Sequence, residues 1–128
     1  MPLTLESLNS ARAHWRQQEI SEYDFEYDMN GNECVVTVRD GIVKSLLVNG
    51  SEGNSSQLRF FSVDGLFDTL EMDLEAASTV QASTSLMRVR FNPEFGFVER
   101  YVRGSTGVAP AAEIKSVVFA VVTESAPG

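Results

Sequence analysis

The spacing of apolar residues divides the chain into two helix-like segments and six extended ones. Residues 4–18 and 62–77 carry apolar side chains three and four positions apart, which is typical of a helix with one buried face. Extended patterns follow in the segments 23–28, 34–39, 42–48, 86–91, 97–103 and 114–123. The order α-βββ-α-βββ predicts an α+β fold with one antiparallel sheet of about six strands and two helices packed on one face.

Both expected helices begin with a suitable cap. Thr4 and Ser62 each precede an apolar pattern, and a hydroxyl oxygen there can accept a hydrogen bond from a free amide of the first turn. Asp64 and Asp68 follow Ser62, where the helix dipole favours acidic side chains. Trp15 lies on the apolar face of the first helix. Two interpretations of it stay open, because it either seals this helix onto the sheet or stacks on a ligand.

The first three extended segments form an antiparallel meander. Segment 23–28 alternates strictly, so its aromatic residues share one face and its acids the other. Those acids are Asp24, Glu26 and Asp28. Asn30 to Asn32 turn the chain, and Asp40-Gly41 predicts a two-residue hairpin turn because both positions of such a turn need positive φ.

The rest of the chain holds loops and one long apolar run. Residues 49–57, 78–85 and 104–112 are rich in small and polar residues and are expected to be loops or linkers. Residues 114–123 are almost continuously apolar. This pattern predicts a central strand that is covered on both faces.

Composition narrows the class of partner. The 128 residues fit a single domain over 1–128, with frayed ends expected at 1–3 and 124–128, and 43% of them are hydrophobic. A net charge of -8 disfavours nucleic acids, because such binders place Lys and Arg near phosphates. No run approaches the roughly 18 apolar residues of a membrane span. No secretory signal pattern follows Met1.

Few residues offer catalytic or metal-binding chemistry. The single cysteine, Cys34, lies in a β-branched strand pattern, so we expect a buried thiol and no internal disulfide. The single histidine, His14, has no recognisable serine motif with which to form a triad. One histidine and one cysteine do not complete a zinc site. We therefore predict no catalytic residues, no metal, no cofactor and no enzymatic activity.

Several short motifs appear in a fairly specific order along the chain. They lie at residues 11–16, 23–27, 36–41, 63–68 (Val-Asp-Gly-Leu-Phe-Asp) and 91–96 (Phe-Asn-Pro-Glu-Phe-Gly). Over roughly residues 11–103 the chain resembles an uncharacterised family of small bacterial proteins, many of which carry lipoprotein or secretory signals. The resemblance implies an envelope or secreted location and no known catalytic residues. Without a signal in this chain, a cytoplasmic location stays open.

The element order is also similar to that of two kinds of binding module. These are the modules of β-lactamase inhibitor proteins and the propeptide domains associated with peptidases. Both present a sheet face to a protein partner, although a shared architecture does not fix a function.

Basic residues concentrate in two expected strands. Four of the ten are Arg88, Arg90, Arg100 and Arg103. One interpretation is that they pair across strands with the acidic strip of segment 23–28. The other is that they anchor a partner on a charged sheet face. Replacing Arg90 by alanine separates the two, because only docking predicts lost binding with intact stability.

The leading functional prediction is a non-enzymatic, envelope-associated domain that binds a protein or peptide. Its open sheet face, or the loops 49–57 and 104–112, would carry the binding. The candidate binding residues are Arg88, Arg90, Arg100, Arg103 and Trp15. The alternative is a small-molecule or lipid site between helices and sheet, lined by Trp15, Phe25, Phe67 and Phe91. A homodimer formed through an edge strand also stays open.

Overall fold

The computed structural model describes the chain except for residues 1, 54, 80–84, 106–111 and 123–128. Two helices, α1 (Leu5–Gln17) and α2 (Val63–Thr79), accompany a short 3-10 helix, η1 (Ser55–Phe60). The strands are β1 (Tyr23–Met29), β2 (Asn32–Arg39), β3 (Ile42–Val48), β4 (Ser51–Glu52), β5 (Ser85–Phe91), β6 (Val98–Ser105) and β7 (Ala112–Val121). The α+β class and the single antiparallel sheet are confirmed, and the sheet has seven strands.

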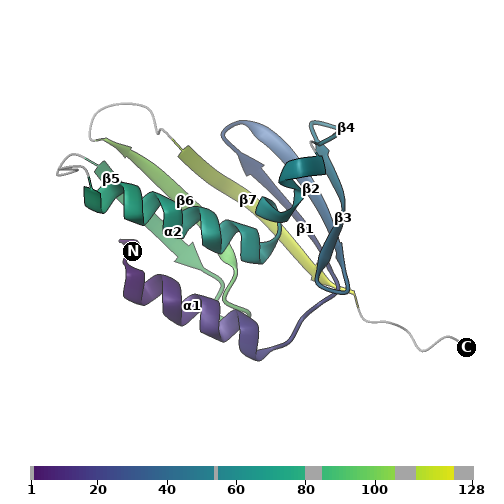
Figure 1. Ribbon diagram of the computed structural model, residues 1–128, viewed down its shortest axis with the longest axis horizontal. Coiled ribbons are helices and arrows are strands. Elements are labelled where there is room, and N and C mark those ends of the chain that lie inside the picture. Colours follow the sequence, from purple (N-terminus) through teal and green to yellow (C-terminus); the bar gives the residue numbers. More distant parts are fainter. Residues whose placement is uncertain (1, 54, 80–84, 106–111, 123–128) are drawn as a thin grey trace, which may run out of the picture.

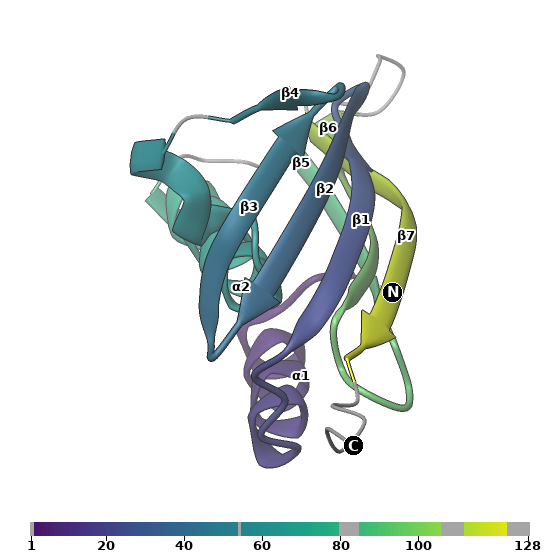
Figure 2. The same cartoon turned by 90° about the vertical axis from the view of Figure 1, so that its right-hand side faces the viewer.

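The sheet joins the two halves of the chain in its middle. Its strand order is β4-β3-β2-β1-β7-β6-β5, so β1 of the first half pairs with β7 of the second. Both α-helices lie on one side of this sheet (Figure 1). In the view turned by 90°, no described helix covers the other side (Figure 2). The sheet therefore has a helix-covered face and an open face.

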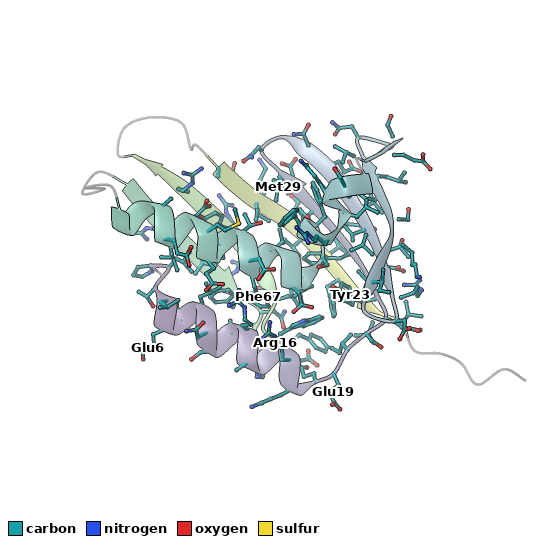
Figure 3. All side chains as sticks on the ribbon, in the orientation of Figure 1. Glu6, Arg16, Glu19, Tyr23, Met29 and Phe67 are labelled. Atoms are coloured by element: carbon teal, nitrogen blue, oxygen red, sulfur yellow. The ribbon has the colours of Figure 1, made fainter. Side chains whose placement is uncertain are left out.

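The core lies between the helices and the sheet. Tyr23, Phe25 and Tyr27 point toward the helices with 2%, 0% and 2% of their surfaces exposed, while the acids between them face the open side. From α2, Leu66 and Phe67 are fully buried in the same core cluster. Figure 3 shows side chains filling this layer, whereas Glu6 and Glu19 point away from the molecule. The predicted aromatic and acidic faces of β1 are confirmed.

Local signals in the sequence correspond to real caps and turns. Thr4 and Ser7 form a reciprocal capping box at the start of α1. Ser62 Oγ accepts a hydrogen bond of 3.0 Å from the amide of Gly65 in the first turn of α2. The turn between β2 and β3 has φ values of 55° at Asp40 and 72° at Gly41, as its sequence predicts.

The prediction for residues 114–123 is correct about the position of the strand but wrong about its burial. Strand β7 is central, but it is open on one face, where the side chain of Val118 is 58% exposed. Both helices lie on the opposite face, so an apolar run here does not signal two-sided burial. A register shift against β1 and a φ of 56° at Ser116 also interrupt the strand.

Two further expectations need correction. Residues 1–3 are not frayed throughout, because Pro2 forms a β-bridge with Arg88 and Leu3 is only 5% exposed. The expected loop at 49–57 contains β4 and the start of η1. The expected tail at 124–128 and most of the expected 104–112 loop lie outside the described residues.

Candidate interaction surface

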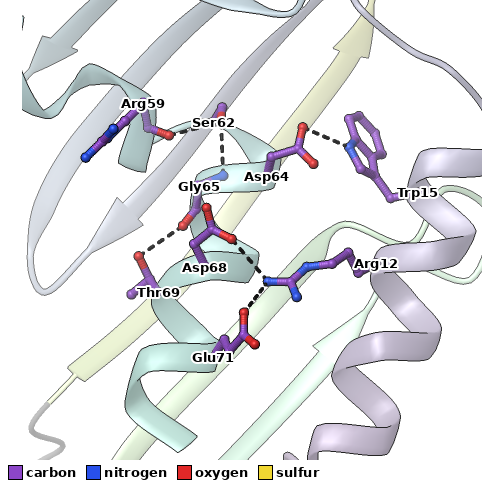
Figure 4. A network of polar contacts seen from close by, with 9 residues as sticks. All are labelled: Arg12, Trp15, Arg59, Ser62, Asp64, Gly65, Asp68, Thr69 and Glu71. Atoms are coloured by element: carbon purple, nitrogen blue, oxygen red, sulfur yellow. Dashed lines mark hydrogen bonds and ion pairs between the residues drawn. The ribbon is translucent and has the colours of Figure 1, made fainter. Parts of the chain in front are cut away.

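The motifs at 11–16 and 63–68 meet each other across the two helices. Nη2 of Arg12 lies 3.2 Å from Oδ1 of Asp68 and 3.1 Å from Oε1 of Glu71 (Figure 4). Nε1 of Trp15 points at Oδ2 of Asp64 over 3.5 Å. The polar residues of these motifs therefore join α1 to α2, which gives them a structural role.

The glycine within the second motif allows η1 to approach α2. A Cβ on Gly65 would overlap the backbone of Arg59 and Phe60, so no larger residue fits without a shift. Beside it, Thr69 Oγ1 donates a hydrogen bond of 3.1 Å to the carbonyl of Gly65 (Figure 4). This part of the motif is explained by close packing.

The turn at residues 92–96 is built by Asn92 and docks on α1. Oδ1 of Asn92 accepts hydrogen bonds of 2.9 Å from the amide of Glu94 and 2.7 Å from the amide of Phe95. On α1, Nε2 of His14 lies 2.8 Å from the carbonyl oxygen of Glu94. The single histidine thus contacts a backbone carbonyl in a helix-to-turn contact.

Trp15 packs inside the protein. The residue is 3% exposed. Its ring contacts those of Tyr23 and Phe119 edge-on, with centroid distances of 5.3 and 5.6 Å. Edge-to-face packing of this kind stabilises aromatic cores. This geometry favours the sealing interpretation over ligand stacking.

The aromatic residues proposed to line an internal ligand cavity pack against one another. Phe25 and Phe67 are fully buried, and the Phe67 and Phe91 rings lie 6.2 Å apart. The ring centroids of Phe25 and Tyr27 lie 5.0 Å apart. Such contacts are those of a filled core.

Cys34 is a buried thiol, as predicted. The residue is 1% exposed on the helix-covered side of β2. Burial raises the pKa of its thiol, and the nearby negative charge of Asp28 raises this pKa further. A raised pKa leaves less thiolate, which is the reactive form. Within the described ranges, no group of three or more His, Cys, Asp or Glu residues is placed to hold a metal ion.

The four candidate arginines do not share one face. Val89 and Tyr101 point toward the helices, so their strand neighbours Arg88, Arg90 and Arg100 lie on the open face by alternation. Arg103 lies on the helix-covered face instead.

There Arg103 belongs to a polar contact with α2. Its Nε is 3.5 Å from Oδ2 of Asp73, which also accepts a 2.7 Å hydrogen bond from Tyr101. Burial raises the pKa of Tyr101, and the contact with Asp73 raises this pKa further. Alternation along β6 already separates Arg103 from Arg100, but the sequence does not say which side of this strand is covered.

The arginines do pair across strands, but with other acids than expected. Arg90 Nε lies 3.1 Å from Glu99 Oε1, and Arg100 Nη2 lies 2.8 Å from Glu113 Oε2. Among the described residues, no ion pair joins them to the acids of β1. The reason is topological, because β7 separates β1 from β6.

One line of charged side chains crosses the open face from strand to strand. Its members are Glu33, Asp28, Lys115, Arg100 and Arg90, on β2, β1, β7, β6 and β5. Asp28 is directly opposite both Glu33 and Lys115, and Arg100 is directly opposite Arg90. The pairing of β6 with β7 ends at Tyr101 and Ile114, and Arg100 and Lys115 are the next residues beyond this pair. We call this line the charge row.

The charge row has an acidic half and a basic half. Glu33 and Asp28 form the first, and the remaining three residues form the second. A hollow of about 310 Å³ adjoins the acidic half, lined by Glu26, Tyr27, Asp28, Glu33, Ser116 and Val118. Sequence reasoning missed Glu33 and Lys115, since only the strand order brings them into one line.

A second hollow of the surface lies away from the charge row. An open pocket of about 700 Å³ lies where the β2–β3 turn approaches η1 and the start of α2, with Ile42, Arg59 and Asp68 among its lining residues. Asp68 is already engaged by Arg12. No helix in the described part of the chain is long and apolar enough to cross a membrane.

Comparison with known proteins assigns this chain to a family without a known activity. Residues 7–102 match the model of a family described as "Family of unknown function (DUF6174)". The match spans α1 to most of β6 and includes four members of the charge row, all except Lys115. No curated protein and no solved structure gives a match.

Proposed function

Because this chain belongs to the DUF6174 family, whose function is unknown, we propose a function from its surface: it is a protein-binding module that docks a partner on the open face of its sheet. It acts by binding and carries out no reaction of its own. The family resemblance supports a role at the bacterial envelope. The binding residues are those of the charge row together with Arg88.

A facing pair of acidic side chains supports this proposal most strongly. Asp28 faces Glu33 directly across β1 and β2. Arg90 also faces Arg100 across β5 and β6, but each of these arginines is paired with a glutamate. Like charges at directly opposed positions destabilise a sheet. A partner that offers opposite charges would remove this repulsion, so the arrangement suits a docked state better than a free one.

Apolar surface beside the charges adds to the support. Val118 is 58% exposed on β7, in the middle of the sheet, and Ala120 lies exposed next to it. Their cross-strand neighbours on β1 are Glu26 and Asp24. An apolar patch with polar side chains at its rim is a common pattern in protein interfaces. The alternative, a small molecule between helices and sheet, has less support because Phe25 and Phe67 fill that layer.

Site-specific photo-crosslinking tests the proposal. A photoreactive phenylalanine analogue replaces Val118 on the open face, or Met72 on α2 as the control, since both side chains are well exposed at 58% and 60%. Each full-length variant is expressed and irradiated in the organism that encodes it. We expect a discrete adduct from position 118 that is lost on adding Arg100→Glu, and none from position 72.

The opposite results would overturn the proposal. These are the same adducts from both positions, no adduct from position 118, or an adduct that persists unchanged with Arg100→Glu. Circular dichroism of each variant confirms that the fold is retained. The mass of the adduct also identifies the kind of partner.

A further inference from the structure

We propose that the partner on the open face is a second copy of this chain. The inference rests on the proposed function, since it uses the same surface, and it names the occupant. The two copies pack sheet on sheet about a two-fold axis that runs along the strands, between β1 and β7. These two strands are the middle of the six long strands of the sheet.

This axis brings opposite charges together. The two-fold rotation reverses the order of the strands across the axis. Strand β1 therefore lies over β7 of the second copy, and β2 lies over β6 of the second copy. Along the charge row, Asp28 then meets Lys115 of the second copy, and Glu33 meets Arg100 of the second copy. Each contact occurs twice, because a two-fold interface is self-complementary.

The same packing relieves the acidic neighbours within each copy. The carboxylates of Asp28 and Glu33 lie at directly opposed positions in the free chain and repel each other, whereas Arg90 and Arg100 are already paired with Glu99 and Glu113. In the dimer each acidic pair lies over a basic half. Charge complementarity of this kind selects a partner and fixes its register. The partner must therefore carry its acidic and basic residues in the reverse order. A second copy turned about this axis does so.

The sheet alone supplies most of the area that a stable interface needs. Six long strands at about 4.8 Å spacing and about 7 residues of 3.4 Å each present roughly 700 Å² of sheet. A stable interface buries about 800 Å² of accessible surface on each partner. Two sheets packed face to face at about -30° form an ordinary sandwich layer. Side chains around the sheet would supply the remaining area.

The edges of the sheet are less suited to pairing. At one end, Pro2 bridges to Arg88 of β5. At the other end, β4 pairs with Leu47 and Val48 of β3, and the register shift in β3 leaves Lys44 exposed on that strand. Short strands, shifts and lysines are devices that oppose edge-to-edge association. We therefore place the dimer contact on the open face.

Charge-reversed variants test this arrangement by mixing. Sedimentation equilibrium measures the molar mass of the full chain at about 0.15 M ionic strength, where the net charge of -8 is screened beyond about 8 Å. We expect Glu33→Lys alone and Arg100→Glu alone to weaken self-association about tenfold or more, because each places like charges in both contacts. An equimolar mixture of the two variants should regain it, since a mixed dimer restores an opposite-charge pair in both contacts between positions 33 and 100.

Lys44→Glu is the matched control, because it reverses an exposed charge on β3 that does not belong to the charge row. It should leave the dimer unchanged. A monomeric wild-type chain, a mixture that stays monomeric, or a dimer lost with Lys44→Glu would overturn the inference. A monomeric wild type together with a photo-adduct of a different mass at position 118 would reject the second copy and keep the proposed function.

Discussion

Gly96 packs so closely on α1 that a Cβ at this position would lie 2.8 Å from the carbonyl oxygen of Ala11. Its φ of +93° is also unfavourable for any residue with a side chain. Gly96→Ala should therefore lower the free energy of unfolding by about 2–4 kcal/mol, from backbone strain and loss of the close contact together. Urea unfolding followed by tryptophan fluorescence of Trp15 measures the change.

Gly31→Ala is the control for backbone strain. Gly31 has a similar φ of +87°, but a Cβ there would meet nothing within 4 Å. Its substitution should cost only about 1–2 kcal/mol. Equal losses in the two variants would contradict the idea that docking of the 92–96 turn on α1 contributes to stability.

Gly65 gives a test in which packing and helix propensity predict opposite signs. It lies in α2 without a positive φ, so alanine would stabilise the free helix by about 1 kcal/mol. In the protein, the new Cβ would overlap the backbone of Arg59 and Phe60. We expect a net loss of about 2 kcal/mol in thermal or urea unfolding. A gain in stability would show that η1 moves away from α2 at little cost.

Tyr23 should make the protein sensitive to alkaline pH. Burial raises the pKa of Tyr23 from 10.0 to about 12, while its hydroxyl oxygen accepts a 3.0 Å hydrogen bond from the amide of Val63. Between pH 10 and pH 12 the unfolded chain loses this proton and the folded chain keeps it. Stability from this group is thus complete below pH 10 and falls by about 2–3 kcal/mol as pH rises to 12.

Tyr23→Phe isolates that effect. At pH 7 it should cost about 1–3 kcal/mol, because the buried amide of Val63 loses its acceptor. Between pH 10 and 12 its stability should fall less steeply than that of the wild type. Parallel slopes for the two proteins would assign the alkaline loss to other groups, such as Tyr27 and Tyr101, whose pKa values are also raised by burial.

Removing a like charge from the charge row should not destabilise the free chain. Glu33→Gln takes one carboxylate away from Asp28, so the unfolding free energy should stay equal or rise by about 0.5 kcal/mol. Arg39→Gln is the contrast, because Arg39 pairs with Asp24 at 3.2 Å, and its loss should cost about 0.5 kcal/mol. Unfolding at high dilution measures both. A marked loss with Glu33→Gln would mean that the row stabilises the monomer.

Local signals made much of the fold predictable from the sequence. The caps at Thr4 and Ser62 and the Asp40-Gly41 turn depend on neighbours along the chain, and the structure confirms them. Strict alternation in β1 likewise fixed its buried face. The openness of β7 could not be predicted this way, since it depends on where both helices pack.

The candidate site was only partly predictable. Alternation correctly placed Arg88 and Arg90 on one face. It also separates Arg103 from Arg100, but it could not show that the partner of Arg103 is Asp73 of α2. The charge row could not be predicted either, because Lys115 lies beside Asp28 only through pairing between strands that are far apart in the sequence.

Thiol accessibility of the open face tests the central claim most directly. Val118→Cys and Met72→Cys each add an exposed thiol, on the open face and on α2, while Cys34 stays buried. The rate of modification by a charged thiol reagent is measured as protein concentration rises through the range of self-association. We predict that the thiol at position 118 becomes protected in step with dimer formation while the one at position 72 reacts at a constant rate. A thiol at 118 that stays equally reactive at every concentration would contradict self-association through the open face.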